Sequence, residues 1–241
     1  MKHTVIVVAG GKGLRMGGGL PKQFIPIQGK PVLMHTLEAF YKWNSAAELL
    51  LVIPEEHEYY WNMLCKEINF TVPHCVVYGG ETRFHSVRNG LREVKDDCLV
   101  AVHDGVRPFV TADVITSCFK KAEVSGAAIP VVPMVESARI IIRSESDNKN
   151  PGINSVIEVE NADSSPLSRK HLFIVQTPQV FQSELLHKAY KQPYDERFTD
   201  DASLVEALGH KIHLVNGNRE NIKITTPIDL QYAEFQLKND S

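Results

Sequence analysis

A glycine-rich turn is the part of this chain whose residue types point most clearly to chemistry. It lies in the stretch AGGKGLRMGGGLPKQF, residues 9–24, directly after the apolar run Val5–Val8. Gly10, Gly11 and Gly13 permit positive φ and close approach of the backbone, so successive N–H groups can line an anion. The stretch therefore predicts a phosphate-binding loop that follows a strand.

Two cations, Arg15 and Lys22, follow these glycines seven residues apart and could surround a phosphate during its transfer. The spacing excludes a Walker loop, because no Lys-Ser or Lys-Thr pair follows the glycines. Met16 stands where a dinucleotide fingerprint has glycine. A glycine-rich loop that carries solvated cations is the alternative that these residues leave open.

A second group of polar residues, VHDGVRP at 102–108, ends an apolar run. Ligands of open α/β sheets bind at the carboxyl ends of strands, where the carboxylate of Asp104 could hold a metal ion or hydroxyls. Asp104 could instead cap the following helix, since Asp is a favoured cap residue. We expect His103 to be a structural residue at the end of the strand.

A third group begins an amphipathic helix within GGETRFHSVRNGL, residues 79–91. Arg83 and Ser86 lie near its start, where unpaired N–H groups and the helix dipole favour an anionic or polar ligand. An amphipathic helix without a ligand would have the same pattern. Its apolar face is formed by Phe84, Val87, Leu91 and Val94.

Short β-rich runs alternate with amphipathic segments along the chain, which predicts an α/β fold with a mostly parallel sheet flanked by helices. We expect helices over residues 32–43 and 55–68, and a later one that Thr199 caps with Asp200 and Asp201 in its first turn. The expected strands are Val5–Val8, Leu49–Ile53, Cys75–Tyr78, Leu99–His103 and Ala127–Val132. We interpret the 241 residues as one Rossmann-like domain.

A projecting β arm interrupts this pattern at about residues 136–172. Alternating apolar runs at Ala138–Ile142 and Ser155–Val159 surround the polar segment SESDNKNPG, which indicates the tip of a hairpin. An isolated two-stranded arm is marginally stable in water. We therefore expect the arm to pack against another subunit.

Composition restricts the partners and the compartment. The net charge of −3 provides no overall positive field that would attract nucleic acid. The apolar stretches are too short to span a bilayer. The four cysteines and ten histidines show neither CxxC nor HExxH spacing, so we expect free thiols and no zinc site. These features favour a cytoplasmic protein without a membrane partner.

The loop sequence A-G-G-x-G-x-R-M followed by P-K-Q-F resembles the signature of cytidylyltransferases, which belong to the nucleotidyltransferases. The resemblance is strongest to the 2-C-methyl-D-erythritol 4-phosphate cytidylyltransferase family, and residues about 138–168 alone lack a clear counterpart. Further segments match in the same order: GGETRFHSVRNGL, VHDGVRP, QTPQVF, TDDASLVEALG and ENIKITTPIDL.

The resemblance implies transfer of a cytidylyl group from CTP to a polyol phosphate, with Mg²⁺ as cofactor and a homodimer that exchanges its arms. It assigns Arg15 and Lys22 to stabilisation of the transition state. The implied nucleotide-binding residues are Ala9, Gly10, Gly11, Gly13, Gly80, Arg83, Ser86, Asp104 and Thr177. The implied acceptor-binding residues are Arg107, Ser137, Arg169 and Lys223, and Asp104 is also the implied metal ligand.

Two positions depart from the family pattern. Glu136-Ser137 stands where the family often has Asp-Thr for the acceptor hydroxyls. The segment before Arg169 is longer than usual, so Arg139 or Arg143 could replace Arg169 at the acceptor phosphate.

Three other functions compete with this interpretation. A ribitol-5-phosphate cytidylyltransferase would share the glycine loop, PKQF and HDxxRP. A non-catalytic nucleotide-sensing module would not need both Arg15 and Lys22. A dinucleotide-dependent oxidoreductase would need a third glycine and an acidic residue ending the second strand, where Pro54 precedes Glu55.

Overall fold

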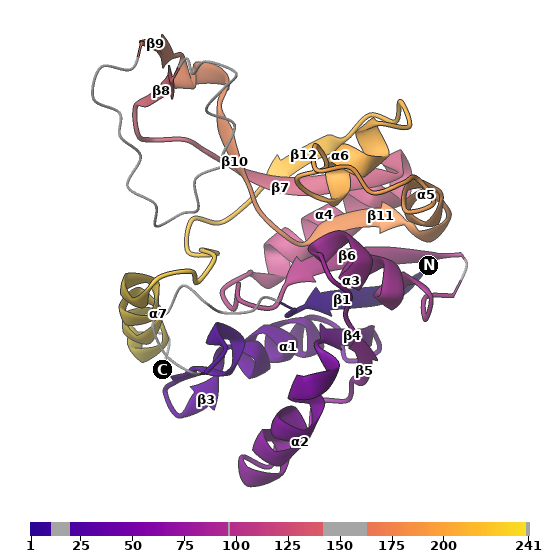
Figure 1. The fold of residues 1–241 in the computed structure, drawn as a ribbon, viewed down its shortest axis with the longest axis vertical. Coiled ribbons are helices and arrows are strands. Elements are labelled where there is room, and N and C mark those ends of the chain that lie inside the picture. The colour runs from indigo at the N-terminus through magenta and orange to yellow at the C-terminus, as the bar shows by residue number, and fades with distance from the viewer. Residues whose placement is uncertain (11–19, 96, 142–162, 240–241) are drawn as a thin grey trace.

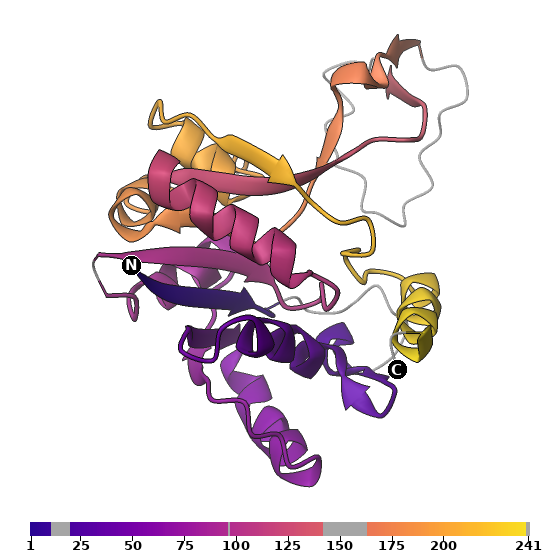
Figure 2. The same cartoon turned by 180° about the vertical axis from the view of Figure 1, so that it is seen from behind.

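A mixed sheet forms the centre of the molecule (Figures 1 and 2). The computed structural model describes residues 1–10, 20–95, 97–141 and 163–239. The order of neighbouring strands is β10-β7-β11-β6-β1-β4-β5, with β12 on the other edge of β7. The strands are β1 (Lys2–Val8), β4 (Glu48–Ile53), β5 (Cys75–Tyr78), β6 (Cys98–Asp104), β7 (Ala127–Pro133), β10 (Phe173–Val175), β11 (Gln179–Gln182) and β12 (His213–Asn216).

The sheet is mostly parallel, as the sequence predicts. Strand β1 pairs in parallel with both β4 and β6, and Val8 lies opposite Val52 on one side and Asp104 on the other. Strand β11 is antiparallel to its neighbours β6 and β7, and β10 is antiparallel to β7. The carboxyl ends of β1, β4 and β6 consequently meet at one edge of the sheet.

Helices cover both faces of this sheet. Buried residues of α1 and α4 pack on one face, and buried residues of α3, α5 and α6 pack on the other. The helices are α1 (Val32–Trp43), α2 (Glu58–Glu67), α3 (Arg83–Leu91), α4 (Ala112–Ser125), α5 (Ser183–Ala189), α6 (Asp201–Glu206) and α7 (Pro227–Asn239). Short 3-10 turns are η2 (Lys22–Phe24), η3 (Glu55–His57) and η5 (Arg169–His171), and a small ribbon joins β2 (Pro26–Ile27) to β3 (Lys30–Pro31).

The expected cap of helix α6 was wrong by one residue. Asp200, not Thr199, has extended backbone angles, and its carboxylate accepts a hydrogen bond from the N–H of Ser203 at 2.9 Å. The Ser203 side chain in turn accepts from the N–H of Asp200, which completes a capping box. Asp201 lies in the first turn as expected, although its side chain has a further role described below.

The arm projects from the sheet beyond β7 and β10 (Figure 1). Its first strand, β8 (Ala138–Ile141), pairs antiparallel with β9 (Ser164–Leu167), with Ala138 opposite Leu167. The expected partner Ser155–Val159 was therefore wrong for this strand, and that run itself lies outside the described residues. The observed partner, SSPL at residues 164–167, has no alternation of apolar residues, so the local pattern did not indicate it as a strand.

Candidate active site

A pocket of about 620 Å³ opens where β1, β4 and β6 end. The chain segments that follow these strands meet the start of α3 and the turn η2 around it. The lining residues are Val8, Ala9, Gly10, Lys22, Gln23, Pro54, Glu55, Glu56, Tyr78, Gly79, Gly80, Glu81, Thr82, Arg83, Ser86, Asp104, Val106 and Lys223. Motifs that are distant in the sequence thus share one cavity, at the place where open α/β sheets bind ligands.

Asp104, the last residue of β6, is surrounded by three cations. Its Oδ2 lies 3.0 Å from Nζ of Lys223 and 3.2 Å from Nε of Arg107, and its Oδ1 lies 3.6 Å from Nε of Arg83. Although burial opposes ionisation, Arg83, Lys223 and Arg107 hold the pKa of Asp104 well below its usual range. Asp104 therefore carries a negative charge throughout the physiological pH range and caps no helix in the described structure.

The neighbours of Asp104 fix the end of the strand. The hydroxyl of Thr177 accepts a hydrogen bond from the N–H of Asp104 at 3.1 Å and contacts Nδ1 of His103 at the same distance. The other ring nitrogen of His103 contacts the carbonyl of Arg107 at 3.0 Å. Burial lowers the pKa of His103 to about 4, so this ring is neutral. Its position fits the structural role expected from the sequence.

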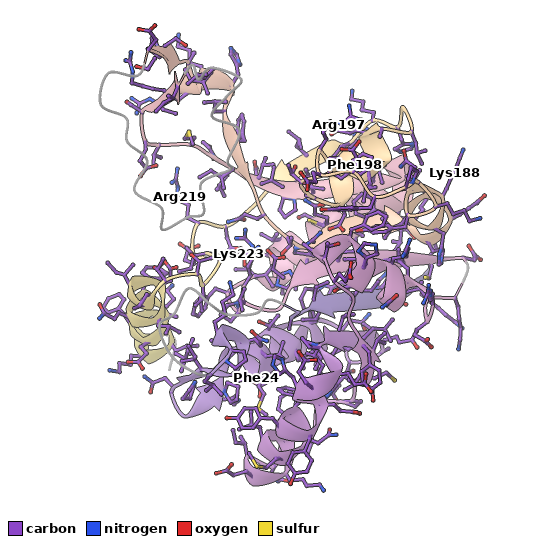
Figure 3. The ribbon with its side chains drawn as sticks, viewed as in Figure 1. Phe24, Lys188, Arg197, Phe198, Arg219 and Lys223 are labelled. Carbon is purple, nitrogen blue, oxygen red and sulfur yellow. The ribbon has the colours of Figure 1, made fainter. Side chains whose placement is uncertain are left out.

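Arg107 points behind Asp104 instead of lining the pocket. Its Nη1 donates to the carbonyl of Asn221 at 2.8 Å, and its side chain is only 12% exposed. This contact joins the loop after β6 to the segment between β12 and α7, which carries Lys223 (Figure 3). A direct contact between Arg107 and an acceptor phosphate stays a prediction.

The turn after β5 is built around Ser86. Its hydroxyl accepts from the N–H of Gly80 at 3.1 Å and donates to the carbonyl of Thr82 at 3.0 Å. A Cβ on Gly80 would lie 2.5 Å from Cβ of His85, so the turn requires glycine there. Gly10 lies on the other side of Ser86, where an added Cβ would meet its Oγ at 3.4 Å. The two glycine turns thus form one wall of the pocket.

Lys22 also lines the pocket, at the start of η2. Next to it, the buried amide of Gln23 donates to the carbonyl of Ala9 at 3.0 Å and ties this turn to the end of β1. Sequence reasoning gave Gln23 no role beyond its place in PKQF. The position of Gln23 in PKQF was the signal for a role at the site. A buried glutamine amide needs a hydrogen-bond partner close by, and the carbonyl of Ala9 is that partner.

Arg83 is held by a residue that the sequence pattern assigns only to the first turn of a helix. Its two terminal nitrogens donate to both oxygens of Asp201 at 3.0 and 2.7 Å. Asp201 is fully buried and also accepts from the hydroxyl of Tyr190 at 2.5 Å. The TDDAS string carried the signal for Asp201, whereas nothing in the sequence indicated Tyr190.

Several expected site residues lie elsewhere. Ser137 and Arg169 belong to the exposed base of the arm, where Nη1 of Arg169 donates to the carbonyl of Val135 at 2.5 Å, and neither lines the pocket. Arg139 contacts Ser164 within the arm. The candidate site residues Gly11, Gly13, Arg15 and Arg143 lie outside the described residues.

Asp104 offers one carboxylate oxygen to a hard cation. Among residues 1–10, 20–95, 97–141 and 163–239, no group of three or more His, Cys, Asp or Glu side chains could hold a metal ion by itself. Mg²⁺ commonly binds one or two carboxylates together with the phosphates of its substrate. Among the described residues, the cation next to Oδ1 of Asp104 is Arg83, whose Nε is 3.6 Å away, so this oxygen fits that donor set. Within the described part of the chain, no helix is both long and apolar enough to cross a membrane.

Comparisons with known proteins agree over nearly the whole chain. The model of the 2-C-methyl-D-erythritol 4-phosphate cytidylyltransferase family matches residues 3–239. The protein of that name from Bacteroides thetaiotaomicron is 54% identical over 237 residues, covering 98% of this chain and 100% of that one. The corresponding protein from Phocaeicola vulgatus is 51% identical with the same coverage. The crystal structure of the protein of that name from Thermus thermophilus is 30% identical, covers 99% of this chain and 100% of that one, and has a TM-score of 0.74.

Proposed function

The chain belongs to the 2-C-methyl-D-erythritol 4-phosphate cytidylyltransferase family, and from this premise we propose how its pocket acts. The enzyme transfers a cytidylyl group from CTP to 2-C-methyl-D-erythritol 4-phosphate, giving 4-diphosphocytidyl-2-C-methyl-D-erythritol and pyrophosphate for isoprenoid precursors. One observation supports the assignment of this reaction to the pocket. A single cavity joins the glycine turn at Gly10 to Lys22, Lys223 and Asp104.

The reaction needs alignment and positive charge more than it needs a base. A phosphate oxygen of the acceptor attacks the α-phosphorus of CTP, and the bond from that phosphorus to the bridging oxygen of pyrophosphate breaks. The attacking oxygen is already anionic, so no proton must be removed from it. We assign Lys22, which lines the pocket, to stabilisation of the charge that develops on the α-phosphate, and we assign Arg15 the same role from its place in the motif.

We place the two substrates at different parts of the pocket. We place the nucleotide against Gly10, Gly80 and Ser86, because glycine turns expose N–H groups to a ligand at close range. We place the acceptor near Lys223, whose side chain is 42% exposed while its Nζ contacts Asp104. Thr177 supports the nucleotide side indirectly through its hydrogen bond to Asp104.

Asp104 would hold Mg²⁺ through Oδ1, together with the phosphates of CTP. When bound, the ion neutralises part of the triphosphate charge as pyrophosphate leaves. Lys223 and Arg107 meanwhile occupy Oδ2, which keeps the carboxylate in a fixed orientation.

We further propose a homodimer in which the arm of one subunit reaches the pocket of its partner. Arg169 and Ser137 lie outside the pocket of their own chain, although the family resemblance gives both a role at the acceptor. A guanidinium can hold a phosphate by two parallel hydrogen bonds, which would fix the direction of attack.

The function is tested by measuring pyrophosphate release for each nucleoside triphosphate with 2-C-methyl-D-erythritol 4-phosphate, ribitol 5-phosphate or a hexose 1-phosphate. We expect fast release only for CTP with the methylerythritol phosphate. The same preparation carrying Lys22→Ala controls for contaminating enzymes. Preference for ribitol 5-phosphate would support the ribitol-5-phosphate cytidylyltransferase instead. No release with any pair would support a nucleotide-sensing module.

A further inference from the structure

Asp201 is a buried carboxylate whose partners lie on three different elements. It begins α6, its two oxygens bind Arg83 at the start of α3, and its Oδ1 accepts from Tyr190 directly after α5. The carboxylate of Asp201 has no exposed surface. A buried charge is costly unless it is paired and hydrogen-bonded, and Asp201 meets both conditions through these two side chains.

Arg83 connects this buried carboxylate to the pocket. Its side chain is 32% exposed and lines the cavity, while its two terminal nitrogens bind Asp201, which is not among the lining residues. The remaining nitrogen, Nε, faces Oδ1 of Asp104 at 3.6 Å. Asp201 thus holds the far end of a cation whose near end contacts the pocket carboxylate.

The two oxygens of Asp104 differ because of this arrangement. Oδ2 is engaged by Lys223 and Arg107 at 3.0 and 3.2 Å. Oδ1 has the Nε of Arg83 at 3.6 Å, which is too long for a normal hydrogen bond. If Arg83 were released from Asp201, Asp104 would be the carboxylate nearest to it, and a bidentate pair between them would occupy Oδ1.

We propose that Asp201, supported by Tyr190, is a positioning residue that holds Arg83 in the nucleotide wall of the pocket and prevents a bidentate pair between Arg83 and Asp104 from occupying Oδ1. This inference rests on the proposed function, which places the nucleotide at that wall. Asp201 touches neither substrate in this assignment and acts only through Arg83.

The support behind Asp201 is rigid, as positioning requires. The N–H of Ala202, in the first turn of α6, donates to Oε1 of Gln179 at 2.9 Å. Gln179 begins β11, which pairs with β6 in the central sheet. The start of α6 is consequently fixed to the strand that ends in Asp104.

The test compares Asp201→Asn with Asp200→Asn. Both variants remove a carboxylate at the start of the same helix, but Asp200 contacts neither Arg83 nor the pocket in the structure, and asparagine keeps its capping ability. We expect Asp201→Asn to raise KM for CTP about tenfold or more, the scale of a lost hydrogen bond to a charged group, with KM for the acceptor unchanged. Asp200→Asn should leave both constants near their wild-type values.

Tyr190→Phe supplies a milder variant in case Asp201→Asn folds poorly. It removes one donor to Asp201 and should raise KM for CTP about threefold to tenfold. Thermal unfolding and circular dichroism identify partly unfolded preparations. A loss of folded enzyme alone would lower the apparent kcat without moving either KM, so a structural role gives a different result.

A double-mutant cycle with Arg83→Met shows whether Asp201 acts through Arg83. If it does, Asp201→Asn adds nothing to KM for CTP once Arg83 is replaced. Additive effects of the two substitutions would overturn the proposal, and so would an unchanged KM for CTP in both folded Asp201→Asn and Tyr190→Phe. The wild type is assayed in parallel, because absence of turnover there would contradict the proposed function and not the role of Asp201.

Discussion

The pocket and the arm hold their polar residues in opposite ways. In the pocket, Asp104 and Ser86 are buried: Asp104 contacts Arg83 and Lys223 from distant parts of the chain, and Ser86 holds the turn before its own helix. In the arm, Ser137 is exposed and Arg169 makes a hydrogen bond to the carbonyl of Val135 nearby. Contacts within the chain hold the residues of the pocket in place, whereas Ser137 and Arg169 of the arm are exposed to solvent.

This difference agrees with the proposal that the arm acts on the pocket of a partner subunit. A site stabilises a transition state best when its groups are already fixed before the substrate binds. The hydrogen bonds and ion pairs of the pocket fix its groups in this way. The exposed residues of the arm gain a fixed position only when something packs against them. A second subunit would supply that contact, and the exposed side chains of Phe173, Ile174 and Val175 on β10 favour such an interface.

The largest expected effect concerns the Mg²⁺ ion that we propose for the pocket. Removal of divalent cations with EDTA should abolish pyrophosphate release, and Mg²⁺ should restore it, because the departing pyrophosphate carries charge that must be neutralised. Titration of Mg²⁺ into chelated enzyme measures the return. Turnover that persists after exhaustive chelation would remove the proposed role of Asp104 as a metal ligand.

Replacement of a pocket cation should give the next largest effect. Lys22→Ala should lower kcat by about 10² to 10³, the scale for loss of one preorganised donor to a transition state, and Arg15→Ala should do the same. Lys30→Ala is the matched control, because Lys30 is not among the residues that line the pocket. Its Nζ instead pairs with Oε1 of Glu38 at 2.6 Å. Equal kcat values for Lys22→Ala and Lys30→Ala would show that the pocket does not use Lys22.

The third prediction compares one isoleucine in each region. Ile6 on β1 is 0% exposed, and Ile140 on β8 is 49% exposed. Ile6→Ala should lower the free energy of unfolding by about 2 to 5 kcal/mol, measured by urea denaturation. Ile140→Ala should have little effect on unfolding of one chain and should instead weaken the dimer, measured by analytical ultracentrifugation. A self-association unchanged by Ile140→Ala would place the interface elsewhere.

A smaller effect is expected for the arginine of the arm. Arg169→Lys keeps the charge but loses the planar pair of donors, so it should raise KM for the polyol phosphate about tenfold while the affinity for CTP stays nearly the same. Arg139→Lys and Arg143→Lys serve as comparisons within the arm. If one of them has the larger effect on KM, that arginine replaces Arg169 in the proposal.

Mixing of two inactive proteins tests whether the arm is shared. Arg169→Ala and Lys22→Ala subunits should together recover about a quarter of wild-type activity, because about half of the dimers are hybrids and each hybrid has one intact site. Exchange of subunits is verified by mass spectrometry of the native complex. No recovery after verified exchange would place Arg169 in the site of its own subunit or outside any site.

The sequence by itself determined most of the fold. The expected helix at 32–43 matches α1, and the five expected strand cores lie within β1, β4, β5, β6 and β7. These elements have strong local signals, because burial of one face imposes a period on the apolar residues. The residues of the pocket wall were also predictable, since Gly10, Gly80 and Ser86 lie within motifs that follow strands.

The tertiary structure decided which distant side chains meet. Local patterns could not show that Asp201 holds Arg83, that Lys223 lies beside Asp104, or that β8 pairs with residues 164–167. Each of these contacts depends on the order and register of the strands and on where a helix packs. The periodicity of residues along the chain contains none of this information. The sequence therefore identified the groups that can do the chemistry, while packing between elements distant in the chain fixed their charges, orientations and partners.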